Sequence, residues 1–242
     1  MRINSASRLH KILSKWSDVQ RDTPAVKGWL SVLELKSNGD LRDYLRISDE
    51  LNSLVRELDL LEQKLQQRNT SRSVYESSLS KIAQSLSPQW ISANAHNIQA
   101  RIDSTALSAL AFSSELLDNE EEEIGLDDFS EIVSLINQLE LLLEENEFPD
   151  SLKLVIRRHI ELAERSMAKY PIQGAGALRD ALKMASGDIL MDGDALKQSP
   201  EVRAAIRALW EEFNRVTNAA IKADALIEAG KHAAKFLADL RS

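Results

Sequence analysis

The sequence predicts an all-α protein, a multi-helix bundle of about nine or ten helices, and three observations carry this prediction. Its 242 residues include only eight Gly and five Pro, so long segments contain no residue that interrupts a helix. Between the interruptions, apolar side chains recur at steps of three and four. Aromatic residues make up only 5% and β-branched runs are sparse, which disfavours a large sheet. We therefore expect more than about 60% helix and no strand beyond an isolated bridge.

The N-terminal residues predict two short helices. Apolar side chains at helical spacing indicate a first helix over about 5–20. This segment lacks the apolar run of a secretory signal. Its amphipathic, basic and Ser-rich character is compatible with an organelle presequence, but we interpret it more simply as a first surface helix. A second helix is expected to begin at Thr23-Pro24, with Thr as its N-cap and Pro in its first turn. Asn38-Gly39 should end that helix, and Asp40 can cap the next one.

The strongest periodic signal runs from Leu41 to Gln67, where a heptad seam spans roughly 40 Å of helix. The seam positions are Tyr44, Ile47, Leu51, Leu54, Leu58, Leu61 and Leu65. Further apolar residues widen this stripe at Leu41, Leu45, Val55 and Leu60. A wide stripe favours packing inside a bundle over a free coiled-coil dimer. We expect the seam to be buried along most of its length.

Breakers divide the rest of the chain into further helices. A helix follows 68–71 and ends near Ser87-Pro88, and 90–117 is helical with a break at Asp103-Ser104. The next helix begins at Asp127 or Asp128, where carboxylates complement the helix dipole. The remaining predicted features are a turn at Phe148-Pro149-Asp150, a helix end at Tyr170-Pro171, a helix from Gly174, loops at 186–188 and 191–194, a helix from Ser199-Pro200, and a last helix over about 217–240.

Two segments flank the helix that follows the predicted turn. They are Phe148-Pro149-Asp150-Ser151 and Gly174-Ala175-Gly176-Ala177-Leu178-Arg179. Over about 148–183 the chain resembles stretches of uncharacterised bacterial all-α proteins. That resemblance implies a helical fold in a bacterial cytoplasm, and it brings no activity or cofactor with it.

Charge is distributed very unevenly along the chain. The formal net charge is −8, yet the segment 102–152 contains no Lys or Arg. Two mildly basic flanks enclose this acidic middle. We expect an N-terminal helical region over 1–118 and a C-terminal region over 119–242 that contains the acidic hairpin. A single elongated bundle is the alternative organisation.

Composition excludes several classes of site. The chain contains no Cys, so disulfides and thiolate metal sites are impossible, which fits a cytoplasmic protein. No window approaches the roughly 18 apolar residues that a membrane span needs. With a pI near 5.2, direct nucleic-acid binding is disfavoured despite basic clusters near the N-terminus and after the acidic hairpin. The Ala-rich last helix favours packing on the bundle, or a homo-oligomer contact, over lying on a membrane.

Three patterns suggest ligands only superficially. Gly174-Ala175-Gly176 follows a helix and lacks a third Gly, so a tight turn is favoured over a phosphate loop. Asp188, Asp192 and Asp194 do not have the spacing of a calcium loop. Asp224, Glu228 and His232 share a helix face, but one stripe without ligands from another helix favours a solvated surface over a metal site. We therefore assign no metal and no cofactor.

Histidine chemistry is equally weak as a signal. The four His residues are widely scattered. His159 lies near the apolar face of its helix, which favours a half-buried structural role over catalysis. We assign no catalytic residue.

The acidic middle provides the leading functional hypothesis. Fifteen uncompensated carboxylates can be an ordinary solvated face, but their mutual repulsion opposes compactness, and most helices relieve it with interleaved cations. We therefore expect a non-enzymatic interaction protein that binds a basic protein partner, as immunity proteins, antitoxins and inhibitors do. The expected contact residues are Glu115, Asp118, Glu120, Glu121, Glu122, Glu123, Asp127, Asp128, Glu131, Glu140, Glu144, Glu145 and Glu147.

Two other functional classes stay open. The chain could be a structural or oligomeric accessory subunit that uses the seam or the last helix as its contact. It could also be an enzyme whose site is assembled from residues distant in sequence. Under the leading hypothesis the loop at Glu120–Glu123 lies outside the apolar stripes, so its charges should contribute little to packing.

Overall fold

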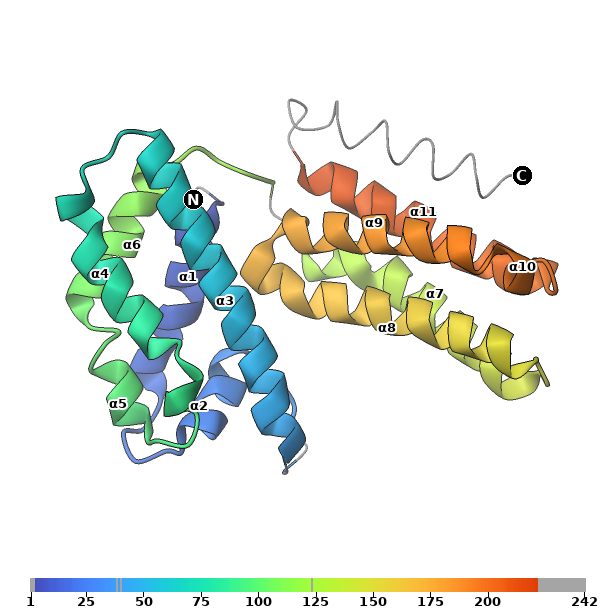
Figure 1. Cartoon of the computed structure of the whole chain (residues 1–242), viewed down its shortest axis with the longest axis horizontal. Helices are drawn as coiled ribbons and strands as arrows, with labels where there is room; N and C mark the ends of the chain where they lie inside the picture. The colour runs from blue at the N-terminus through green and yellow to red at the C-terminus, as the bar shows by residue number, and fades with distance from the viewer. Residues whose placement is uncertain (1–2, 38, 40, 123, 222–242) are drawn as a thin grey trace. The chain divides into compact units, whose positions relative to one another are not determined.

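The computed structural model describes residues 3–37, 39, 41–122 and 124–221. Of the described residues 79% are helical, in three short 3₁₀ helices and eleven α-helices, of which nine have seven or more residues (Figure 1). No strand occurs in this part of the chain, where β structure is limited to two isolated bridges, Pro24 with Asn94 and Glu121 with Ile221. The predicted all-α multi-helix fold is therefore confirmed. The helices form two compact units, residues 1–120 (unit 1) and residues 121–242 (unit 2).

Unit 1 is built around its first helix. Helix α1 packs against α3 and α6, while α4 packs against α6 and α2 against α3 (Figure 1). The elements of unit 1 are α1 (Ser5–Ser14), η1 (Lys15–Asp18), α2 (Ala25–Val32), α3 (Leu41–Gln67), α4 (Arg72–Ser85), η2 (Pro88–Trp90), α5 (Ala95–Gln99) and α6 (Ser104–Leu116). Leu9 and Leu13 on α1 are completely buried. The interpretation of this segment as a surface helix was therefore wrong, because α1 contributes core side chains to contacts with two other helices.

The heptad seam of α3 is buried from Ile47 to Leu65, as predicted. The first turn differs, because Tyr44 is 40% exposed and Leu41 and Leu45 are more exposed still. Asp43 occupies the inward position there, 4% exposed, and accepts hydrogen bonds from the Ser37 hydroxyl (2.7 Å) and the Gly39 amide (3.0 Å). Since Asp43 faces inward, the neighbouring leucines face outward.

Two predicted helix starts in unit 1 had different outcomes. Asp103 is the N-cap of α6, as expected, and its Oδ1 accepts a hydrogen bond from the Ala106 amide at 2.8 Å. Thr23 is not the N-cap of α2, because its carbonyl accepts a hydrogen bond from Ala95 and Pro24 takes the cap position. Asn38 and Asp40 lie outside the described residues.

Unit 2 has the arrangement of an up-and-down four-helix bundle. Helix α7 packs against α8 and α11, and α9 packs against the same two helices (Figure 1). The elements are η3 (Leu126–Phe129), α7 (Ser130–Glu145), α8 (Asp150–Gln173), α9 (Ala175–Met191), α10 (Gly193–Leu196) and α11 (Pro200–Ala220). Fully buried side chains from α7, α8, α9 and α11, including Ile132, Leu178, Trp210 and Phe213, fill the core.

Three predicted breaks in unit 2 were wrong because helices continue through them. Helix α8 includes Pro171 and ends at Gln173, so the missing amide affects only its last turn. Helix α9 continues through 186–188, where the Ser186 hydroxyl donates to the Leu182 carbonyl at 2.7 Å. Thr217 belongs to α11 and its hydroxyl donates to the Phe213 carbonyl. The predicted last helix otherwise lies in residues 222–242, outside the described part.

Candidate functional site

The carboxylates of the acidic middle occupy two different environments. Two of them, Glu120 and Glu121, are withdrawn from solvent, with a side chain 21% exposed at Glu120 and a residue 3% exposed at Glu121. Glu123 lies outside the described residues. The exposed members of the expected contact set are Glu115, Asp118, Glu122, Asp127, Asp128, Glu131, Glu140, Glu144, Glu145 and Glu147. The expectation that the 120–123 loop contributes little to packing was therefore wrong at its first two residues.

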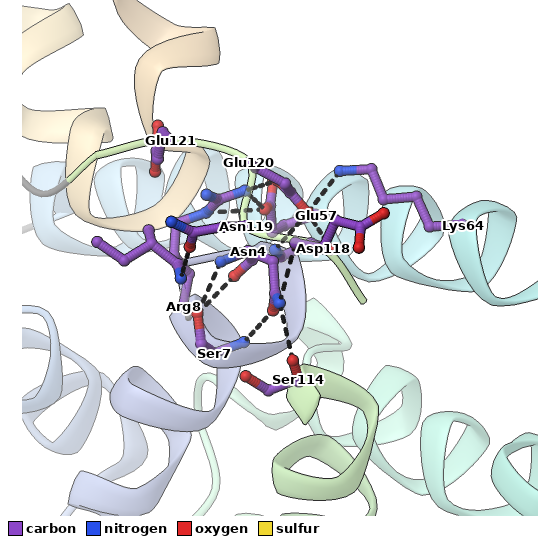
Figure 2. Close-up of polar contacts among 12 residues, drawn as sticks. Asn4, Ser7, Arg8, Glu57, Lys64, Ser114, Asp118, Asn119, Glu120 and Glu121 are labelled. Atoms are coloured by element: carbon purple, nitrogen blue, oxygen red, sulfur yellow. Dashed lines mark hydrogen bonds and ion pairs between the residues drawn. The ribbon is translucent and has the colours of Figure 1, made fainter. Parts of the chain in front are cut away.

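Glu120 belongs to a buried charge cluster in unit 1. Figure 2 shows its carboxylate between Arg8, 2.9 Å away, and Lys64, 2.6 Å away. It also accepts a hydrogen bond from the Ser5 amide at 2.9 Å. The Arg8 guanidinium, itself only 9% exposed, also pairs with the carboxylate of Glu57 on α3. Two cations and two carboxylates thus compensate one another inside unit 1.

The cluster also fastens the N-terminal segment. The Glu120 amide donates to the Ile3 carbonyl at 2.7 Å, and the Ile3 amide donates to the Asn119 side chain at 2.5 Å. Asn4, completely buried, caps α1 reciprocally with Ser7 and donates to the Ser114 carbonyl at 3.0 Å (Figure 2). Apart from the Asn4–Ser7 cap, these hydrogen bonds join positions more than a hundred residues apart. They hold the end of unit 1, at 114–120, against its N-terminal segment.

Electrostatics distinguishes the two carboxylates in this cluster. Burial raises the pKa of Glu57, and the pairing with Arg8 only partly opposes that effect. Burial also acts to raise the pKa of Glu120, but Arg8, Lys64 and the Ser5 amide together hold it below its usual value. These charged groups therefore satisfy one another within unit 1.

Glu121 serves unit 2 as a helix cap. Its carboxylate accepts a hydrogen bond from the Ala175 amide at the N-terminus of α9, where the helix dipole favours negative charge. Gly174 adopts φ +58° and ψ −150°, a conformation essentially restricted to glycine. A Cβ at this position would lie 2.6 Å from the Glu121 carboxyl carbon. Gly174-Ala175-Gly176 is therefore a tight turn, and its amide holds a carboxylate of the chain itself.

The remaining acidic side chains lie at the surface around η3 and α7. We call the exposed carboxylates of Asp127, Asp128, Glu131, Glu140, Glu144, Glu145 and Glu147 the α7 acidic face. Within the described residues no ion pair involves Glu140, Glu144 or Glu145. Burial raises the pKa of Glu164 on α8, and the charges of Glu140 and Glu161 raise it further. Negative charge therefore accumulates across the adjacent surfaces of α7 and α8.

Helices α8 and α11 meet at a buried histidine. His159 is 0% exposed, and the Trp210 indole N–H donates to its Nδ1 at 3.2 Å. Burial lowers the pKa of His159 to about 4, with a smaller contribution from the charge of Arg158. The predicted structural histidine is thus more deeply buried than half, and it is uncharged at neutral pH.

The suggested metal ligands have other roles where they are described. Asp188 and Asp192 lie beside the Arg158 guanidinium, at 3.9 and 2.8 Å, and Asp194 pairs with Lys197 at 2.9 Å. The part of the chain that the structure describes holds no group of three side chains placed to bind a metal ion. Asp224, Glu228 and His232 lie outside it. Nor does any described helix combine the length and apolarity required to cross a bilayer.

Sequence reasoning missed Arg8 and Glu57, although a local signal existed. Arg8 precedes Ile12 by four residues, and Glu57 follows Leu54 by three and precedes Leu61 by four. Each charge therefore sits within an apolar stripe, a position that predicts burial with a partner. No comparable local signal marks Glu120 or Glu121, whose partners are distant in sequence.

Comparisons with protein-family models, curated proteins and solved structures find no match for this chain.

Proposed function

We propose that this chain is a non-enzymatic, cytoplasmic interaction protein that binds a basic protein partner through the α7 acidic face. The observation that carries the proposal is the set of exposed carboxylates on α7, where Glu140, Glu144 and Glu145 form no ion pair within the described residues. The charge of Glu140 also adds to the effect of burial in raising the pKa of Glu164 on α8. Like charges gathered on one helix oppose folding slightly, and a cationic partner relieves that repulsion. Such a surface accelerates encounter with a basic protein and selects against acidic ones.

The surface that supports this proposal is smaller than the sequence indicated. Glu120 and Glu121 belong to the interior of their units, so recognition rests on the carboxylates of η3 and α7. Arg215 on α11 marks one border of the face. Its pKa is raised mainly by the hydrogen bond to Glu212, with smaller contributions from Asp128 and Glu131. Glu140 and Glu144, away from that cation, are the residues we expect to contribute most.

The alternative function was an oligomeric subunit that uses the seam of α3 as its contact. That seam is not available to a partner, because its side chains from Ile47 to Leu65 lie in the core of unit 1. An oligomeric contact would have to use another surface. Exposed apolar side chains occur at Leu41, Tyr44 and Leu45 on the first turns of α3 and also in unit 2, for example at Leu190 and Met191 on α9. Nothing else about them indicates a partner, so we keep the acidic face as the proposal.

The test is a charge reversal with a matched control. A basic partner is captured at low salt on the immobilised full chain, and its association rate is then measured with the purified proteins. Glu140→Lys with Glu144→Lys should slow association at least about tenfold, and the wild-type rate should fall steeply between about 0.05 and 0.5 M salt. Asp59→Lys with Glu76→Lys, at exposed sites of unit 1, makes the same change in net charge. Equal effects of the two pairs, or a rate that salt does not alter, would remove the proposal.

A further inference from the structure

The buried pair His159 and Trp210 joins α8 to α11 in the core of unit 2. The imidazole and indole rings meet edge to face, with centroids 5.9 Å apart. Phe213, completely buried, packs on the same indole with ring centroids 5.0 Å apart. A hydrogen bond between two buried rings therefore links two of the four long helices of the bundle.

The hydrogen bond determines the state of the imidazole. Because Nδ1 accepts from the indole N–H, the neutral ring carries its hydrogen on Nε2. Nε2 is buried without a hydrogen-bond partner among the described residues. The neutral ring thus already has one unsatisfied donor, the Nε2–H. When the ring is protonated, the second proton can bind only at Nδ1. That proton would point at the indole N–H, so the hydrogen bond would be replaced by two opposed donors.

Charged groups on the surrounding helices do not stabilise an imidazolium. Arg158 adds positive charge beside the ring, and the two carboxylates nearest it along α9 are already paired with that guanidinium. The charged residues close to the pair in sequence include Arg158 on α8 and Arg207 and Glu211 on α11. Asp188 and Asp192, at the end of α9, pair with Arg158. Of these, only Arg158 affects the pKa of His159.

We propose that unit 2 contains an acid-sensitive switch: protonation of His159 at Nδ1 breaks its hydrogen bond to Trp210 and favours opening of α8 and α11, while unit 1 responds much less. This inference is independent of the partner proposed above. Unit 1 differs because its buried groups are carboxylates and cations in compensating pairs. The raised pKa of Glu57 favours the folded state in acid, and the stabilising contribution of Glu120, whose pKa is lowered, is lost only as pH falls below the usual value of 4.5.

The direction of the effect follows from the two protonation states. The pKa of His159 is about 4 in the folded chain and 6.5 in an exposed one, so its stabilising contribution is complete above pH 6.5 and is lost as pH falls toward 4. With these two pKa values, lowering the pH from 8 to 5 increases the unfolding equilibrium constant of unit 2 about 30-fold. Glu164 opposes this change, because its raised pKa favours the folded state in acid.

Hydrogen exchange of the full-length chain, read by mass spectrometry, resolves the two units separately. After correction for the pH dependence of chemical exchange, peptides from α8 and α11 should show about a 30-fold larger opening constant at pH 5 than at pH 8, while α3 peptides change much less. His159→Asn keeps an acceptor for the indole and removes the titration, so its peptides should lose most of this pH dependence. His96→Gln, at an exposed site of unit 1, should behave as wild type.

Equal responses of α3 and α11 in the wild type, or a retained pH dependence in His159→Asn, would overturn the proposal. If that variant does not fold, NMR titration of the wild-type imidazole decides. A midpoint below about 5 supports the switch, and a midpoint at 6 or above overturns it.

Discussion

The two units bury polar groups by different means. Unit 1 encloses Arg8 with Glu57 and Glu120 in its interior, whereas unit 2 encloses a neutral imidazole and a carboxylate that caps a helix. Compensated charges depend on every member being present, and the contribution of Glu120 is lost as pH falls through its lowered pKa. A neutral histidine tolerates neither protonation nor loss of its single hydrogen-bond partner. The comparison shows that adjacent glutamates, Glu120 and Glu121, can stabilise two separate cores by two separate mechanisms.

The largest effect should come from placing an unpaired charge in the core of unit 1. Leu54→Asp buries a carboxylate at a site that is 0% exposed, which should destabilise unit 1 by about 3–5 kcal/mol. Leu45→Asp, on the same helix but 65% exposed, should change the free energy of unfolding by less than about 0.5 kcal/mol. Thermal denaturation followed by circular dichroism measures both. Similar melting of the two variants would mean that the seam is not in a core.

The next effect tests whether the charges of unit 1 act as a set. Arg8→Met leaves Glu57 and Glu120 without their shared cation and should cost about 3 kcal/mol in urea denaturation. Adding Glu57→Leu removes one stranded carboxylate, so the double variant should recover part of that loss. Strict additivity of the two substitutions would show that Arg8 and Glu57 are not coupled.

A smaller effect tests the helix cap in unit 2. Gly174→Ala introduces a Cβ against the Glu121 carboxylate at a positive φ and should destabilise unit 2 by about 1–3 kcal/mol. Gly187→Ala makes the same chemical change within α9, at an exposed site with open space around it. It should stabilise by about 0.5–1 kcal/mol. Urea denaturation of both variants should therefore give shifts of opposite sign, and shifts of the same sign would contradict the described turn.

Local sequence patterns predicted the fold well where one helix provides its own signal. The bounds of α3 and the Asp103 cap of α6 follow from periodicity and capping chemistry alone. The errors occurred where tertiary packing decides. Pro171 was predicted to end a helix, yet Ile172, one residue later, is buried and the helix continues to Gln173. Asp43, held inward by hydrogen bonds, turned Leu41 and Leu45 toward solvent.

The acidic segment illustrates the same limit at the candidate site. Composition identified its excess charge correctly but assigned one role to all of its carboxylates. Glu120 and Glu121 differ from Glu140 and Glu144 only through partners far away in the chain, Arg8 in the first case and Ala175 in the second. Such partners become visible only once the helices are packed. Arg8 and Glu57 were more accessible to prediction, because they interrupt apolar stripes.

The most direct test of this division uses two variants that each remove two negative charges. We measure the urea unfolding free energy of Glu120→Ala with Glu121→Ala, and of Glu140→Ala with Glu144→Ala. The first pair removes one of the two carboxylates paired with Arg8 and leaves the Ala175 amide without its acceptor, so it should lose at least about 2 kcal/mol. The second pair lies on the α7 acidic face and should change stability by less than about 0.5 kcal/mol. Equal losses in the two variants would contradict the separation of buried, structural carboxylates from exposed carboxylates available to a partner.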